Sequence, residues 1–233
     1  MTLEAVVFDF DGLIIDSEWV IYETARAAFA VHGHELRVEA WSTIVGINER
    51  TEPGWWELVC AAAGVTFDRV DYEAAYEAQD RSNRDSLPPM PGVVDLVEAL
   101  GAEGVPLGIA SSSSLGWLER HLPRLGLDGR FAAVIGSDLV GGVGKPAPDV
   151  YLRACADLGV APGRSVAIED SGHGIAAGKA AGMAVVAVPG RITRFQDLTG
   201  ADLLVDSLAA LHPHRLAALV ADRRPVRPSE GSR

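Results

Sequence analysis

The stretch VVFDFDGLIIDSE, residues 6–18, joins a strand-forming apolar run to a series of carboxylates. The run from Ala5 to Phe10 predicts a buried β-strand, yet it contains Asp9 and leads directly to Asp11. Burying a charge costs free energy unless the charge is paired and hydrogen-bonded. Carboxylates at the end of a buried strand therefore indicate a functional site.

Downstream of residue 90, short apolar runs alternate with helical patterns. The runs are PLGIAS (106–111), AAVIGSD (132–138), SVAIED (165–170), MAVVAV (183–188) and DLLVDS (202–207). Helical stretches such as VVDLVEALGAEG lie between them, and several end at glycine, as helix C-termini often do. Alternation of this kind predicts βα units. We therefore expect an α/β fold, with a Rossmann-like parallel sheet core and helices on both of its faces.

Residues 17–84 contain helical patterns only, so we predict an α-helical insert there. Four of the five tryptophans lie in it: Trp19, Trp41, Trp55 and Trp56. Aromatic residues at helical spacing indicate the core of such an insert rather than a ligand site. The remainder, residues 1–16 and 85–221, would form a discontinuous α/β core. The tail, residues 222–233, is rich in Pro, Arg and Ser and is predicted to be disordered.

Composition and charge exclude several classes of function. The 233 residues carry a formal net charge of −12, which argues against a nucleic-acid or anionic-membrane surface. No secretory signal or membrane span is visible in the sequence. Cys60 and Cys155 lie far apart among apolar or small residues, which indicates free thiols in a reducing compartment. We expect a cytoplasmic protein, with a monomer as the default state.

Polar residues follow several of the predicted strands, and ligands bind beyond the carboxyl ends of the strands in open parallel sheets. They are Asp9, Asp11, Ser111, Lys145, Glu169 and Asp170. Carboxylates in one crevice repel one another and raise each other's pKa, a cost that a hard cation removes. Mg²⁺ binds one or two carboxylates together with substrate phosphate and water, and lysine and serine can hold the remaining phosphate oxygens. The set predicts phosphoryl chemistry at Mg²⁺.

The motifs DFDG, IASSSS, GKPAPD and IEDS occur here in the order and contexts of the haloacid dehalogenase-like superfamily. The chain resembles most closely its branch of small phosphatases and β-phosphoglucomutases, which carry an α-helical cap after the first motif. The resemblance covers nearly the whole chain apart from the tail. It implies a phosphoric monoester hydrolase that uses Mg²⁺ and acts on a small phosphorylated metabolite.

By that resemblance, Asp9 would be the nucleophile that forms an aspartyl-phosphate. Asp11 would protonate the leaving oxygen and then activate water. Ser111 and Lys145 would bind the transferring phosphoryl group. Gly12 would let the chain leave the strand sharply, so that backbone N–H groups come near the phosphate.

The resemblance also implies a metal site. Mg²⁺ would sit on Asp9, on the backbone carbonyl of Asp11 and on Asp170. Glu169 would lie at the metal or just behind it, and the sequence leaves these two places open.

Several neighbouring residues have structural interpretations. Ser112, Ser113 and Ser114 look like helix-capping residues, and we assign phosphate binding to Ser111, with its neighbours as the alternative. Asp16 and Ser17 are interpreted as a hinge and a helix cap rather than as catalytic groups. His173 lies at a predicted helix start, where this family often has asparagine, and we expect it to cap the helix or to support the site.

The segment TIVGINERTEP resembles the cap loop that faces the active site in this branch. Asn48, Glu49 and Arg50 are therefore the candidate specificity residues. The mutases carry a histidine in the first cap helix and an arginine after the cap-loop glycine. Here DSEWVIYE has no histidine, and Glu49 stands where that arginine is expected, with Arg50 one position later.

The first functional interpretation is a Mg²⁺-dependent phosphatase that acts on a sugar or polyol phosphate through an aspartyl-phosphate. The alternative is phosphoryl transfer between sugar hydroxyls, as in a β-phosphoglucomutase. A signalling receiver domain also gathers acidic residues, Ser or Thr, and Lys at strand ends. However, the chain is too long for a single receiver domain, and the helical insert has no place in one.

Overall fold

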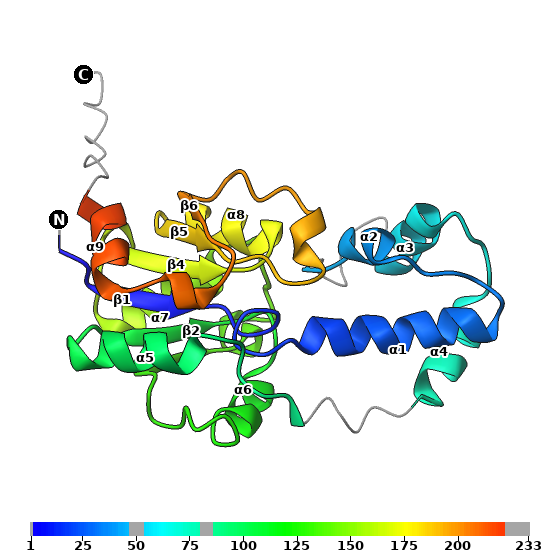
Figure 1. Cartoon of the computed structure of the whole chain (residues 1–233), viewed down its shortest axis with the longest axis horizontal. Helices are drawn as coiled ribbons and strands as arrows, with labels where there is room; N and C mark the ends of the chain where they lie inside the picture. The colour runs from blue at the N-terminus through cyan, green and yellow to red at the C-terminus, as the bar shows by residue number, and fades with distance from the viewer. Residues whose placement is uncertain (1, 47–53, 80–85, 222–233) are drawn as a thin grey trace.

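The computed structural model describes residues 2–46, 54–79 and 86–221 (Figure 1). The strands are β1 (Ala5–Phe8), β2 (Leu107–Ala110), β3 (Ala133–Ile135), β4 (Ser165–Glu169), β5 (Ala184–Ala187) and β6 (Leu203–Leu204). The α-helices are α1 (Ser17–Val31), α2 (Val38–Ser42), α3 (Trp55–Ala63), α4 (Arg69–Glu77), α5 (Val93–Ala102), α6 (Leu115–His121), α7 (Asp149–Leu158), α8 (Gly172–Ala180) and α9 (Pro213–Ala221). Short 3₁₀ helices are η2 (Ser137–Val140), η3 (Pro162–Arg164), η4 (Thr193–Phe195) and η5 (Leu208–Ala210).

The six strands form one parallel sheet in the order β3-β2-β1-β4-β5-β6. In register, Val6 of β1 pairs with Leu107 of β2 on one side and with Val166 of β4 on the other. The chain builds outward from β1 through β2 to β3, and then from β4 to β6 in the opposite direction. The strand order therefore reverses between β1 and β4, and ligands bind at the carboxyl ends of the strands at such a point.

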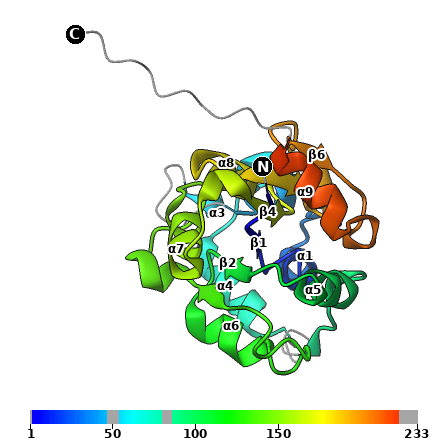
Figure 2. The same ribbon diagram turned by 90° about the vertical axis from the view of Figure 1, so that its left-hand side faces the viewer.

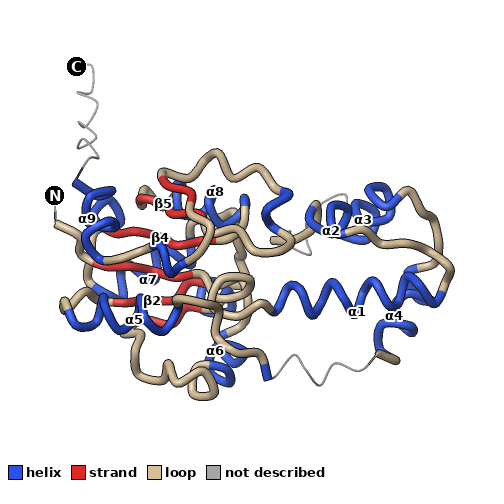
Figure 3. Tube along the Cα trace, in the orientation of Figure 1, coloured by secondary structure: helices blue, strands red, loops and turns tan. Residues whose placement is uncertain are grey.

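Helices cover both faces of the sheet because strands such as β1 and β5 are apolar throughout, and successive side chains along a strand point to opposite faces. In β1, Val6 and Phe8 belong to a hydrophobic cluster with residues of α5 and α9, whereas Val7 belongs to a second cluster with residues of α7 and α8. Figure 2 shows these helices arranged around the sheet, and Figure 3 shows the strands as a layer among them. The predicted fold class is confirmed.

The helices α1 to α4, which we call the helical insert, lie between β1 and α5 in sequence and beyond one end of the sheet in space (Figure 1). They have a hydrophobic cluster of their own, in which Trp41 and Trp56 are buried. The Phe29 ring packs against Trp56 and Tyr72, with centroids 6.0 and 5.6 Å apart. The interpretation of these aromatic residues as the core of the insert is confirmed.

The elements differ from the predictions in detail. Strand β1 ends at Phe8, two residues earlier than predicted, although the Asp9 N–H still donates to the Ile168 carbonyl at 2.9 Å. The short helix α2 gave no recognisable periodicity in the sequence because it has only five residues. The tail, residues 222–233, lies outside the described residues. Among the helices that the structure describes, none is both long and apolar enough to cross a membrane.

Candidate active site

The predicted site residues meet at the carboxyl edge of the sheet. Asp9 follows β1, Ser111 follows β2, Asp170 follows β4, and Lys145 comes from the loop between β3 and α7. They line a cavity of about 90 Å³. Its other lining residues are Asp11, Glu18, Val45, Gly46, Ser112, Ser113, Ser171 and His173. The helical insert thus contributes Glu18, Val45 and Gly46, so the cavity lies between the insert and the sheet.

Lys145 is buried between two carboxylates. Its Nζ donates to Asp9 Oδ1 and, at 2.6 Å, to Glu169 Oε1. Burial lowers the pKa of Lys145, but the charges of Asp9 and Glu169 outweigh burial and raise the pKa above its ordinary value. Lys145 is therefore a fixed positive charge beside Asp9, where it can hold an oxygen of a phosphoryl group.

Glu169 is completely buried, and its contacts orient Lys145. Glu169 Oε1 accepts from the hydroxyl of Tyr151 at 2.6 Å as well as from Lys145. Burial raises the pKa of Tyr151 well above its usual range, so this phenol stays protonated and donates. A Cβ atom at Gly174, in the first turn of α8, would overlap the carboxyl group of Glu169. Only glycine at that position lets the helix approach the carboxylate so closely.

Asp170 is held on the opposite side of Asp9 by neighbouring chain segments. Thr193 Oγ1 donates to Asp170 Oδ2 at 3.2 Å. Gly12 has a φ of +88°, and a Cβ atom there would clash with Asp170 Oδ2. Glycine thus serves here by allowing a close approach of the backbone to Asp170, in addition to the sharp turn that we predicted.

The pKa values of Asp9 and Asp170 are shifted upward. Burial raises the pKa of Asp9 to about 8, although the charge of Lys145 opposes this shift. Burial also raises the pKa of Asp170 well above its usual range, and the charges of Asp9 and Glu169 add to the effect. For these two groups the direction agrees with the prediction, but desolvation is a larger cause than the mutual repulsion on which the prediction was based.

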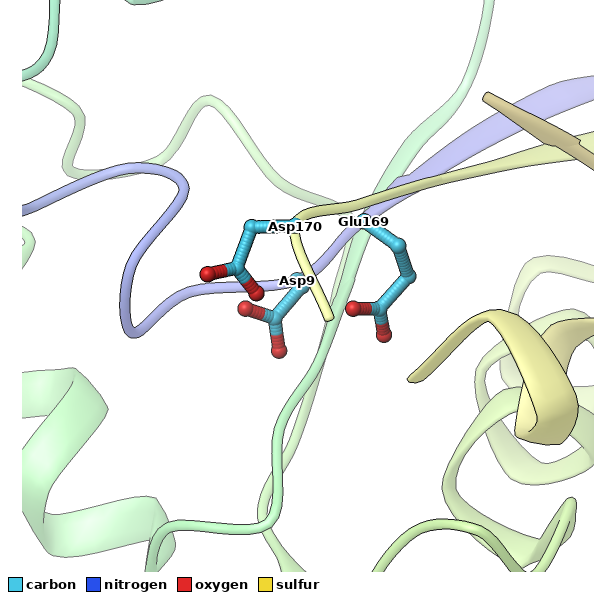
Figure 4. A group of neighbouring side chains, drawn as sticks. All are labelled: Asp9, Glu169 and Asp170. Carbon is cyan, nitrogen blue, oxygen red and sulfur yellow. The ribbon is translucent and has the colours of Figure 1, made fainter. Parts of the chain in front are cut away.

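This donor set fits a hard divalent cation. Carboxylate oxygens of Asp9, Glu169 and Asp170 lie within 4.8 Å of one another, and Figure 4 shows the three side chains. Their burial makes the carboxylates costly to ionise, which a cation would offset. Glu169 accepts from both Lys145 and Tyr151, whereas Asp9 accepts from Lys145 and Asp170 from Thr193, so Asp9 and Asp170 have more free lone pairs for a cation.

The Asp11 carboxylate does not belong to this cluster, since three other groups bind it. Ser17 Oγ donates to Oδ1 at 2.6 Å, Ser113 Oγ donates to Oδ2 at 2.7 Å, and Trp117 Nε1 donates to Oδ1 at 3.1 Å. The expectation that Ser17 caps α1 through its side chain is therefore wrong, because its hydroxyl binds Asp11. Asp16 occupies the cap position and pairs instead with Arg191 at 3.4 Å.

The serine run after β2 also differs from the prediction. Ser111 is buried and its Oγ accepts from the Ser113 N–H at 3.0 Å, so the Ser111 hydroxyl hydrogen can point into the cavity. Ser112 Oγ accepts from the Lys145 N–H at 3.1 Å. Ser114 occupies the N-cap position of α6 without a side-chain cap bond, because Asp138 accepts from the Leu115 N–H. The side chains of Ser111, Ser112 and Ser113 therefore bind groups of the active site rather than cap the helix.

His173 lies in the first turn of α8 and faces the helical insert. A Cβ atom at Gly46 would lie 3.2 Å from His173 Cβ and Nδ1. Ser171 caps α8 by accepting from the Gly174 N–H at 3.2 Å, so capping by His173 is not needed. The other expectation, support of the site, agrees with its place in the cavity lining. Asn48, Glu49 and Arg50 lie outside the described residues.

Sequence reasoning missed three residues that hold the site, Trp117, Tyr151 and Thr193, and it gave Ser113 other roles than binding Asp11. Tyr151 and Trp117 lie on helices whose patterns indicated only packing. Thr193 follows the PGR turn after β5, a strand end that carries no carboxylate. Thr193 could have been found only from the position of β5 next to β4 in the sheet, and the sequence does not specify that strand order.

Comparisons with known proteins agree with this geometry. The model of the haloacid dehalogenase-like hydrolase family matches residues 3–182. CbbY of Cereibacter sphaeroides is 38% identical over 217 residues, which cover 90% of this chain and 94% of CbbY. The fructose-1-phosphate phosphatase YqaB of Escherichia coli (strain K12) is 31% identical over 190 residues, covering 78% and 95% of the two chains.

A solved structure supports the same assignment. A HAD family hydrolase from Deinococcus radiodurans R1, crystallised with bound phosphate and sodium, superimposes with a TM-score of 0.73. Its sequence is 29% identical, and the match covers 94% of this chain and 97% of that one. Family, fold and the carboxylates at the sheet edge thus lead to one conclusion: the chain belongs to the haloacid dehalogenase-like hydrolases.

Proposed function

We propose that this protein is a Mg²⁺-dependent phosphatase that hydrolyses a small phosphate monoester of a sugar or polyol. The observation that carries the proposal is the buried Asp9 carboxylate, which lies between Lys145 and Asp170 at the carboxyl end of β1. A nucleophile next to a fixed positive charge and a metal-binding carboxylate is the arrangement that phosphoryl transfer needs.

In the first step, an Asp9 carboxylate oxygen attacks phosphorus and the bond from phosphorus to the ester oxygen breaks. Asp11 donates a proton to that leaving oxygen, so the sugar or polyol departs as the neutral alcohol. In the second step, Asp11 takes a proton from water, and the water oxygen attacks the phosphorus of the aspartyl-phosphate. Inorganic phosphate leaves and the Asp9 carboxylate is restored.

Asp9, Asp170 and the backbone carbonyl of Asp11 would hold Mg²⁺, which would neutralise charge on the phosphoryl oxygens. Lys145 and the Ser111 hydroxyl would bind the phosphoryl oxygens that do not contact the metal. Glu169 and Tyr151 act through Lys145, because their contacts fix the position of its ammonium group.

The substrate class follows from the insert and from the relatives. Residues 17–84 would act as a cap that closes over the cavity, and residues 1–16 and 85–221 as the catalytic core. A site enclosed between two parts of the chain suits a small molecule better than a folded phosphoprotein. A relative named as a fructose-1-phosphate phosphatase supports a phosphorylated sugar. Asn48, Glu49 and Arg50 remain the proposed specificity residues, on the sequence alone.

Phosphate release from a panel of hexose, hexitol, pentose and glycolate phosphates tests this proposal. We expect release with added Mg²⁺ and none after treatment with EDTA, with one class of sugar or polyol phosphate preferred. Release that is indifferent to EDTA, or absence of release from the whole panel, would contradict the proposal. Conversion of β-glucose 1-phosphate to glucose 6-phosphate, followed in the same samples, would instead identify the mutase alternative.

A further inference from the structure

A loop of the α/β core reaches the helical insert next to the active site. This docking loop, residues 189–196, follows β5 and lies beside α2 (Figure 1). Ile192 is 2% exposed and packs in the hydrophobic cluster of the insert, although it belongs to the core in sequence. The Arg191 guanidinium lies 4.9 Å from the centre of the Trp19 ring in α1. The loop therefore contacts the insert at two of its helices.

Gln196, at the end of this loop, binds both parts of the molecule with one side chain. Its Nε2 donates to the carbonyl of Ser42 at 2.8 Å and to that of Val45 at 3.1 Å. Its Oε1 accepts from the N–H of Gly172 at 2.9 Å. The carbonyls at the end of α2 and the N–H groups at the start of α8 have no partners within their own helices. An amide is suited to both because it carries two donor hydrogens and an acceptor.

Both ends of this connection lead directly into the active site. Gly172 follows Asp170 and Ser171, which line the cavity, and Val45 precedes Gly46, which lines it from the insert. Across the cavity wall, a Cβ atom added at Gly46 would lie 3.2 Å from His173, so the two residues are close neighbours. A change in the Gln196 bonds would therefore change the distance between the insert and the reacting groups.

We propose that Gln196 is a positioning residue, whose amide holds the helical insert closed over the active site. Substrate must enter between the insert and the sheet, so the two hydrogen bonds to the Ser42 and Val45 carbonyls must break and re-form in each turnover, while the bond to Gly172 stays within the core. The inference goes beyond the proposed reaction, since it concerns the equilibrium between closed and open arrangements whatever substrate the site takes.

The alternative is that Gln196 only anchors the first turn of α8. The two roles make opposite predictions for Gln196→Glu. A carboxylate still accepts from Gly172, and its charge is favourable at a helix N-terminus, so an anchor would be kept or strengthened. However, the same carboxylate cannot donate to the carbonyls of Ser42 and Val45 and would repel them.

Hydrogen–deuterium exchange of the full chain separates these roles. The variants are Gln196→Ala, Gln196→Glu and the control Thr199→Ala, which lies just after the docking loop and whose exposed hydroxyl donates to Asp197. Loss of two hydrogen bonds should raise exchange in the peptide that spans α2 and Gly46 by about 5- to 30-fold in Gln196→Ala. We expect Gln196→Glu to exceed that increase and Thr199→Ala to match the wild type.

Enzyme kinetics give the second measurement. Each Gln196 variant should raise KM for the preferred sugar phosphate by a factor similar to its increase in exchange. KM for acetyl phosphate should change much less, because that molecule is too small to need the insert. Wild-type exchange in Gln196→Glu would overturn the proposal, whether or not Gln196→Ala exchanges faster than the wild type. The exchange experiment needs no substrate, so it also tests Gln196 if the phosphatase assignment fails.

Discussion

Gly174 gives the sharpest test of how the site is built. A glycine inside a helix normally destabilises it, so Gly→Ala in a helix is expected to stabilise a protein by about 0.5–1 kcal/mol. At Gly174, in α8, the added methyl group would overlap the carboxyl of Glu169 and push it away from Lys145. At Gly101, in α5, a Cβ atom would meet nothing within 4 Å. The same substitution should therefore lower the free energy of unfolding at Gly174 and raise it at Gly101.

The magnitude follows from the ion pair that the methyl group would disturb. Breaking a buried pair of charges costs about 3–5 kcal/mol, because it leaves charge uncompensated. Subtracting the gain of about 1 kcal/mol from the better helix former leaves a net loss of about 2–4 kcal/mol for Gly174→Ala. Gly101→Ala should instead gain a few tenths to 1 kcal/mol. Lys145 would also lose its fixed position, so phosphate release should fall at least tenfold in Gly174→Ala alone.

Urea unfolding of the two variants measures the free energies, and phosphate release measures the activity. A third variant combines Gly174→Ala with Glu169→Asp, whose shorter side chain vacates the space that the methyl group needs. Measured against Glu169→Asp alone, Gly174→Ala should cost less stability than it costs in the wild type, which a general defect in α8 would not allow. Equal stability and equal activity of Gly174→Ala and Gly101→Ala would refute the account of how Glu169 is held.

The remaining predictions concern the reacting groups. Asp9→Asn should abolish phosphate release and leave the circular dichroism spectrum unchanged; retained turnover would exclude Asp9 as the nucleophile. Asp11→Asn should lower kcat far more than it changes KM, and a rise in KM alone would make Asp11 a binding residue. Trp117→Phe removes one donor from Asp11 and should lower kcat by about two- to tenfold, with KM unchanged. Because burial raises the pKa of Asp9 to about 8, the folded chain binds more protons than the unfolded one between about pH 4 and 8. Stability in EDTA should therefore fall as pH rises through that range, and Mg²⁺ should reduce the fall; a rise with pH would contradict the assignment.

The fold could be predicted from the sequence because each core element has a recognisable pattern of apolar residues. Strands such as β1 and β4 are short apolar runs between helical patterns, and their alternation is enough to predict a parallel sheet. The residues that meet at the sheet edge were accessible for a related reason. Asp9, Ser111 and Asp170 lie directly after strands, and topology alone brings such positions together.

The rest depended on tertiary contacts that carry no local signal. Nothing in the letters around Trp117 or Thr193 shows that one binds Asp11 and the other Asp170. The sequence suggests Ser17 as a helix-capping residue, yet Asp16 takes the cap position and the Ser17 hydroxyl donates to Asp11. Gln196 binds the carbonyls of Ser42 and Val45, 154 and 151 residues earlier in the sequence, a relation that only the folded chain displays.

The most direct test of the central claim is to identify which residue carries the phosphoryl group. Acetyl phosphate supplies a leaving group that needs no protonation, so Asp11→Asn should still form the aspartyl-phosphate but should hydrolyse it slowly. Acid quenching with Mg²⁺ present, followed by mass spectrometry of the peptide around residues 6–18, would locate the adduct. We predict one phosphoryl group on Asp9, accumulated in Asp11→Asn and absent from Asp9→Asn. An adduct on another residue, or none in Asp11→Asn while wild-type protein consumes acetyl phosphate, would contradict the account.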